Sequence, residues 1–132
     1  MTDLARQLEF WLSSASKNWQ TALSLYKLGH YDMCLFCCHL TLEKKLKAII
    51  VYLLKKVPPP IHDLNRLAQI AGLNVSLTQQ EQLNEITKFN IQARYDDIKL
   101  AFYKKATKLF AKKYLEITQE LILWLEKKSG EK

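Results

Sequence analysis

The chain has 132 residues, of which 48% are hydrophobic and 25% charged, with a formal net charge of +7. This length and balance predict one globular domain over residues 1–132 with a frayed tail at 129–132. The longest apolar stretch, Ala48 to Leu54, is too short to span a membrane, and the first residues lack the apolar run of a signal peptide. We therefore expect a cytoplasmic protein.

The first predicted helix follows from apolar residues that recur every three or four positions. Thr2 is a candidate N-cap for this helix, and Gly29 is a candidate stop. The recurring positions are Leu4, Leu8, Trp11, Ala15, Trp19, Ala22 and Tyr26.

The second predicted helix runs from Tyr31 to about Lys56, where the prolines at 58–60 end it. Its core stripe comprises Leu35, Cys38, Leu42, Leu46, Ile49 and Leu53. The opposite face is also largely apolar, with Phe36, Leu40, Val51 and Leu54. A helix that is apolar nearly all round is buried nearly all round, so we expect another helix or a second subunit to cover this face.

Three further helices complete the predicted fold. The third spans about Asp63 to Ala71, and a capping box at residues 78–81 opens a fourth that ends near Asn90. Residues 90–100 lack regular periodicity, and the last helix begins between residues 101 and 108 and ends near Lys128. The sequence thus predicts an all-α fold: an antiparallel, up-and-down helical bundle of three long and two short helices.

The three cysteines, Cys34, Cys37 and Cys38, lie on one short stretch of the second helix. An odd, local set is not a disulfide framework. A metal site would have to combine Cys34 and Cys38 with His39 or His30, whereas zinc ligands usually come from separated segments. We expect these cysteines to pack in the core and predict neither a metal nor a cofactor, although a nucleotide is a candidate ligand.

A charged group interrupts the outer face of the second helix. Glu43 and Lys47 are four residues apart in the order that favours an ion pair, and Lys44 lies beside them. They form either a surface salt bridge or the charged floor of a cleft. His39 lies one turn before Glu43 and is either a packed, hydrogen-bonded histidine or part of the same cleft.

Four segments in order resemble the HEPN domain family, named for "higher eukaryotes and prokaryotes nucleotide-binding". They are CHLTLEKKLKAIIVYL, PPPIHDLNRLA, LNEITKFNIQARYDD and FYKKATKLFAKKYLEITQELILWL, and the resemblance covers about residues 4–126. It implies an up-and-down helical bundle that is usually a homodimer. Many members are encoded beside a minimal nucleotidyltransferase, often as a toxin–antitoxin module. Some members are metal-independent ribonucleases with the active site at the dimer interface, and others are thought to bind nucleotides without catalysis.

The ribonuclease members carry an arginine followed, after four to six residues, by a histidine. No histidine stands at that distance after Arg6, Arg66 or Arg94, so the motif is absent and enzymatic activity is left open. Asp96 also stands where such members often have proline.

The RYDD segment gives the main binding candidates. Arg94 can bind a phosphate with its guanidinium fork and Tyr95 can stack on a base, and we predict a ligand site of Arg94, Tyr95 and Asp96 together with Glu43 and Lys47. Alternatively, Arg94 only caps a helix or pairs with a neighbouring acid.

Two weaker sets of candidates remain. His62 follows three prolines and is either an acid or base or, with the next aspartate, the cap of a helix. Lys104, Lys108 and Lys112 follow one another at four-residue steps, with Lys105 nearby, and form either an anion-binding patch or a solvated face.

Three functions fit these features. The first is a HEPN-type protein that binds a nucleotide or RNA phosphate and works with a nucleotidyltransferase. The second is a diverged metal-independent ribonuclease toxin, in which Arg94 is kept and His39 or His62 replaces the missing histidine. The third is a non-catalytic interaction subunit that uses its apolar second helix.

Overall fold

The computed structural model describes residues 2–129, apart from the side chains of residues 96 and 97, and this part of the chain is all-α. None of its helices is long and apolar enough to cross a membrane. The helices are α1 (Asp3–Leu28), α2 (Tyr31–Leu54), α3 (Leu64–Ile70), α4 (Leu77–Gln92), α5 (Asp96–Lys105) and α6 (Lys108–Lys128). The sequence predicted one helix fewer, because the first half of α5 lies in the segment without regular periodicity.

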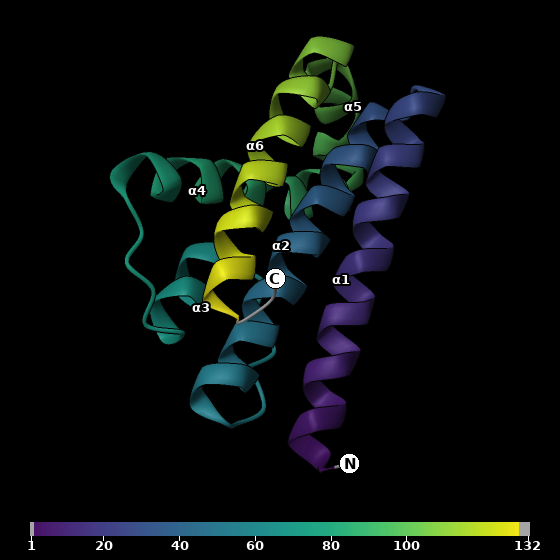
Figure 1. Ribbon diagram of the computed structural model, residues 1–132. Coiled ribbons are helices and arrows are strands. Elements are labelled where there is room, and N and C mark those ends of the chain that lie inside the picture. The colour runs from purple at the N-terminus through teal and green to yellow at the C-terminus, as the bar shows by residue number, and fades with distance from the viewer. Residues whose placement is uncertain (1, 130–132) are drawn as a thin grey trace.

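Helix α2 is the centre of the bundle and contacts each of the other five helices (Figure 1). Helix α2 is buried over most of its surface, with α1 on one side and α6, α3 and α4 on others. The expected cover of its outer face is only partial: Val51 is buried, Phe36 and Leu40 are half-buried, and Leu54 is 39% exposed. One predicted core residue, Leu53, is 44% exposed, because the last turn of α2 extends past the end of α6 (Figure 1).

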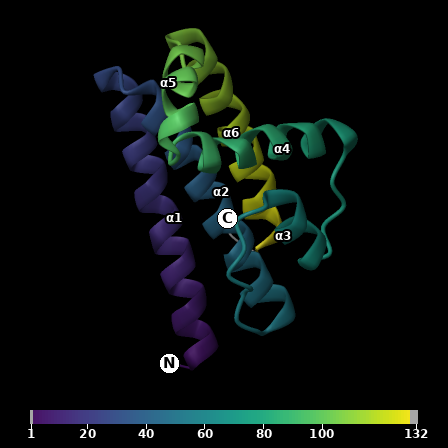
Figure 2. The same cartoon turned by 180° about the vertical axis from the view of Figure 1, so that it is seen from behind.

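The helix directions differ from the predicted up-and-down order. Helices α1 and α2 are antiparallel, but α6 runs parallel to α2, so that Cys38 lies near Thr118 and Lys45 pairs with Glu126. The reason is visible from behind: α3, α4 and α5 carry the chain from the end of α2 back to the level of its start (Figure 2). Three short helices, rather than one tight loop, therefore set the direction of α6.

An aromatic cluster holds these short helices to α6. Phe89 on α4 is fully buried, and its ring centroid lies 5.6 Å from that of Phe102 on α5. On α6, the rings of Phe110 and Tyr114 lie 6.0 Å and 5.3 Å from Phe89. Phe89 thus joins three helices and fixes the link between α4 and α5.

Helix ends confirm some predicted signals and correct others. The Thr2 hydroxyl accepts a hydrogen bond from the amide of Ala5, and Gly29 ends α1 with φ 81°. The capping box is formed two residues earlier than predicted, because Ser76 and Gln79 make both reciprocal bonds, while Thr78 lies within the first turn. Helix α2 ends at Leu54 rather than Lys56, with Lys55 in the left-handed conformation.

The cysteines are buried between α1, α2 and α6, as expected. Among the side chains that the structure describes, no group of three His, Cys, Asp or Glu is arranged to hold a metal ion. Ser129, expected to be frayed, is buried and donates its amide hydrogen to the carbonyl of Leu125, while the rest of the predicted tail, 130–132, lies outside the described residues.

Candidate functional site

The charged group of α2 is buried. Glu43 and Lys47 are each only 5% exposed, and their carboxylate and ammonium groups lie 3.0 Å apart. Of the two alternatives that the sequence left open, the surface salt bridge is therefore wrong. At 100° per residue, Phe36, Leu40, Glu43 and Lys47 point within about 60° of one another and form one stripe along α2.

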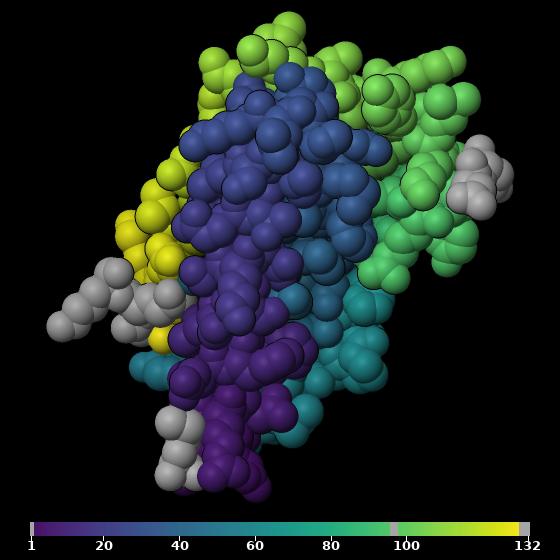
Figure 3. All heavy atoms as spheres, turned by 90° about the vertical axis from the view of Figure 1, so that its right-hand side faces the viewer, coloured from purple at the N-terminus to yellow at the C-terminus, as the bar shows by residue number. Residues whose placement is uncertain are grey.

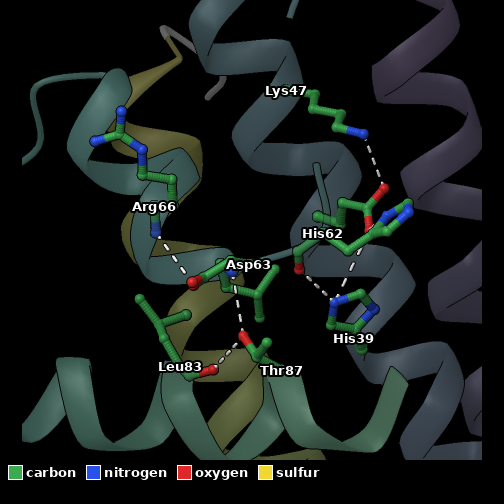
Figure 4. A network of polar contacts seen from close by, with 9 residues as sticks. His39, Lys47, His62, Asp63, Arg66, Leu83 and Thr87 are labelled. Carbon is green, nitrogen blue, oxygen red and sulfur yellow. Dashed lines mark hydrogen bonds and ion pairs between the residues drawn. The ribbon is translucent and has the colours of Figure 1, made fainter. Parts of the chain in front are cut away.

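Three basic side chains surround the Glu43 carboxylate, namely Lys47, His62 and His39, which are labelled in Figure 4. One oxygen accepts a hydrogen bond from Nζ of Lys47 at 3.0 Å, and the other accepts one from Nδ1 of His62 at 2.8 Å. Nε2 of His39 lies 3.8 Å from the second oxygen, which is too far for a hydrogen bond. A buried carboxylate needs such partners, because burial without them is costly.

Hydrogen bonds of His62 and of the two residues after it hold the proline-rich loop in place. The carbonyl oxygen of His62 accepts a hydrogen bond from Nε2 of His39 at 2.9 Å, which joins the proline-rich loop to α2. The next residue, Asp63, caps α3 by accepting from the amide of Arg66, so Asp63 and not His62 supplies the cap. The amide of Leu64 then donates to the hydroxyl of Thr87 on α4 at 3.1 Å; Thr87 is labelled in Figure 4.

His39 is fully buried and hydrogen-bonded, as the packed alternative predicted. Because a carbonyl oxygen only accepts, Nε2 of His39 carries the proton of this bond, and Nδ1 finds no partner among the described residues. Burial lowers the pKa of His39 below its ordinary value of 6.5, against the opposing effects of the bond to His62 and the Glu43 carboxylate. The charge of Arg94 adds to this lowering.

The lowered pKa of His39 makes stability depend on pH. Below about pH 6.5 the unfolded chain takes up a proton at His39 that the folded protein resists, so the free energy of unfolding falls as the pH falls. His39→Gln keeps a donor for the His62 carbonyl but removes the titration. We expect the fall between about pH 7.5 and pH 5.5, measured by urea unfolding, to be smaller in this variant than in the wild type. An equal fall in both proteins would contradict the assignment.

The Glu43–Lys47 pair is complete within the protein. Nζ of Lys47 lies 5.3 Å from the centroid of the Trp11 ring on α1, and its charge is matched by that of Glu43. Because the two charges neutralise each other, neither Glu43 nor Lys47 offers an unpaired charge to a ligand. The geometric effect of the pair is to hold His62, whose side chain is 54% exposed, against α2.

Arg94 lies nearer the start of α2. Its guanidinium carbon is 5.4 Å from the centroid of the Phe36 ring, and the residue is exposed. Among side chains that the structure describes, none forms a hydrogen bond or ion pair with Arg94. Tyr95 is 58% exposed at the start of α5, and the side chain of Asp96 lies outside the described residues.

The predicted site residues therefore lie at two ends of one face of α2, with Arg94 at one end and Glu43 and Lys47 at the other. Phe36, beneath Arg94, and Glu43, which holds His62, are separated by seven residues or about 10 Å along α2. Half-buried Leu40 lies between them. Figure 3 looks onto this side of the molecule, where α2 shows between α1 and the green α4–α5 region.

The lysine patch differs from the prediction. Lys104 belongs to α5, whereas Lys108 and Lys112 belong to α6, because the helix is interrupted at residues 106–107. All three side chains are exposed, but only Lys108 and Lys112 share a helical face. Lys105 is already engaged, with its ammonium 2.8 Å from the Glu85 carboxylate.

The most pronounced surface hollows among the described residues are not lined by the predicted site residues. One of about 620 Å³ lies between α3 and α4 and is lined mostly by amide side chains and Arg66. None of the predicted site residues lines it. Two aromatic residues beside the site, Trp11 and Phe36, were not predicted to belong to it, because Trp11 fits the core period of α1 and Phe36 is one of several apolar residues on the outer face of α2.

The fold defines the chain as a helical bundle built around one central helix. The chain belongs to the HEPN domain family, whose family model matches residues 8–128. The crystal structure of the protein TT1696 from Thermus thermophilus is similar with a TM-score of 0.76, covering 92% of this chain and 98% of that chain. The two sequences are 24% identical, so this likeness shows the fold alone. No curated protein matches the chain.

Proposed function

We propose that the protein binds a nucleotide, or the phosphates of an RNA strand, on the face of α2 between Arg94 and His62. In this proposal Arg94 binds a phosphate and Tyr95 stacks on a base, while Glu43 and Lys47 hold the other end of the face in place. Asp96 stays a candidate from the sequence alone. The net charge of +7 favours anionic partners in general.

One observation carries this proposal: Arg94 is an exposed cation laid over an aromatic ring without an ion-pair partner among the described side chains. Stacking on Phe36 restrains the guanidinium, so less side-chain entropy is lost when its donors bind a phosphate. Tyr95 follows directly and is exposed, which suits base stacking.

Replacing Arg94 with alanine tests the phosphate contact. A hydrogen bond to a charged group contributes about 1.5–3 kcal/mol, so we expect Arg94→Ala to weaken binding of a short uridine oligoribonucleotide roughly tenfold to hundredfold. Fluorescence anisotropy at one fixed salt concentration measures the change, because salt alone shifts such affinities.

Arg66→Ala is the matched control for this experiment. Arg66 is an exposed arginine on α3 whose guanidinium bonds only to the amide oxygen of Gln69, so the variant loses the same charge elsewhere. We expect it to keep most of the affinity. Equal losses of affinity in the two variants would indicate that binding depends on overall positive charge, and would contradict the specific role of Arg94.

The proposal extends to partners. Membership of the HEPN family supports a homodimer that works with a minimal nucleotidyltransferase in a toxin–antitoxin-like module. Sedimentation velocity of the purified protein tests the homodimer. Co-expression with a minimal nucleotidyltransferase, if its own gene lies beside one, tests the partner. A monomeric protein that does not bind the nucleotidyltransferase at micromolar concentration would contradict this part of the proposal.

A ribonuclease is the second candidate, favoured by the carboxylate–histidine pair of Glu43 and His62. Such a pair is a common way to orient an imidazole that exchanges protons with substrate. His39 fits this role poorly, because it is fully buried and its Nε2 is used by the His62 carbonyl. RNA that stays intact after prolonged incubation with the protein in a chelating buffer would exclude this candidate.

A further inference from the structure

The bond between Glu43 and His62 fixes which nitrogen of His62 carries the proton. A carboxylate oxygen accepts, so Nδ1 of His62 is the donor over the 2.8 Å contact. In the neutral imidazole the other nitrogen, Nε2, then holds a lone pair. The His62 side chain is 54% exposed, so this acceptor is accessible to a ligand.

Several contacts hold Glu43 and His62 in this arrangement. Glu43 is itself 5% exposed and is held by Lys47, which lies over the Trp11 ring. The His62 backbone is tied to α2 through His39. An ordinary surface histidine has no such support, and His30 at the start of α2 is an example within this chain, because its side chain makes no capping bond.

We propose that His62 contacts the ligand through Nε2 and accepts a hydrogen bond from a ribose 2′-hydroxyl, with Glu43 as its positioning residue. This inference rests on the proposed function, because it uses the same face of α2. It adds a preference for ribonucleotides over deoxyribonucleotides.

The chemistry of a nucleotide favours the sugar as the donor. Phosphate oxygens carry negative charge and are acceptors, so they cannot donate to a lone pair. Arg94 and Tyr95, which suit a phosphate and a base, lie toward the other end of the face, about 10 Å along α2. The 2′-hydroxyl is present in every ribonucleotide whatever its base, and it is the group by which proteins tell RNA from DNA.

The test compares a short uridine oligoribonucleotide with its 2′-deoxyuridine counterpart, which carries the same base and differs only at the sugar. We expect the wild type to bind the ribonucleotide about fivefold more tightly, the ratio that corresponds to a net hydrogen bond of about 1 kcal/mol. His62→Ala keeps the backbone carbonyl that His39 needs and should reduce the ratio to about one. His30→Ala, the matched control, should leave it unchanged.

The positioning role of Glu43 has its own variant. In Glu43→Leu/Lys47→Met, two apolar side chains replace the buried pair, and His62 is present without its carboxylate. We expect the ribose preference to fall in this variant although His62 remains. A preference that persists in it would overturn the role of Glu43.

A second readout does not depend on binding. Long-range ¹H–¹⁵N correlation spectra, read at the neutral limit of a pH titration, identify the protonated nitrogen of each imidazole. We expect Nδ1–H for His62 and Nε2–H for His39, with His62→Ala used for assignment. An Nε2–H tautomer at His62 would overturn the inference.

The binding outcomes separate this inference from the proposed function. If both oligonucleotides bind equally and Arg94→Ala weakens both, the proposed function stands and the role of His62 falls. If the ribose preference survives in His62→Ala, the role of His62 also falls. If neither oligonucleotide binds, and ATP, GTP and UTP at millimolar concentration do not bind either, both proposals are overturned together.

Discussion

Glu43→Ala is expected to lower the free energy of unfolding by about 3–5 kcal/mol, the usual effect of removing one partner of a buried ion pair. The variant leaves Lys47, which is 5% exposed, without its carboxylate, and it also removes the acceptor of His62. Urea unfolding followed by circular dichroism measures the loss.

Two controls isolate the cause of that loss. Glu43→Leu/Lys47→Met removes both buried charges and should recover much of the stability, because apolar replacement of a whole pair is often neutral. Glu116→Ala removes an exposed glutamate from α6 and should change stability by less than about 0.5 kcal/mol. A loss of that small size in Glu43→Ala would show that Lys47 reaches water and that the pair is not buried in solution.

Phe89→Ala is expected to cost about 3–5 kcal/mol, the range for truncating a buried phenylalanine. Phe89 packs against the rings of Phe102, Phe110 and Tyr114, so the cavity would loosen three helices at once. Because the same cluster holds the α4–α5 link, we also expect weaker oligonucleotide binding through Arg94.

Ile91→Ala is the control for the aromatic cluster. Ile91 lies on the same helix but is 49% exposed, so its truncation should cost far less than that of Phe89. Thermal and urea unfolding of both variants give the comparison. Similar losses at the two positions would mean that Phe89 is not the point at which α4, α5 and α6 join.

Much of the fold could be predicted from local sequence. The caps at Thr2 and Gly29 and the buried α2 follow from side-chain chemistry that acts within a few residues. The capping box was misplaced because Ser76-x-x-Gln79 and Thr78-x-x-Glu81 both fit its pattern, and only the geometry of the helix start decides between them. The parallel course of α6 depends on three short helices whose packing is not local.

The site was predicted in part. The spacing of Glu43 and Lys47 predicted that they pair, but it left open whether the pair is exposed or lines a cleft, and the structure buries it. The anchoring of His62 was missed, because it joins residues 19 positions apart through the path of a proline-rich loop. Arg94 was expected beside Glu43 and Lys47, but it stacks on Phe36, about 10 Å along α2 from Glu43. This contact comes from the crossing of α4 and α2, which no sequence pattern fixes.

The central claim is that the ligand binds along α2 between Arg94 and His62. Mapping amide chemical shifts during titration with the uridine oligoribonucleotide tests it most directly. We predict that the largest changes occur at Phe36, His62, Arg94 and Tyr95. Changes confined to the exposed lysines of α5 and α6, or to the hollow between α3 and α4, would contradict it.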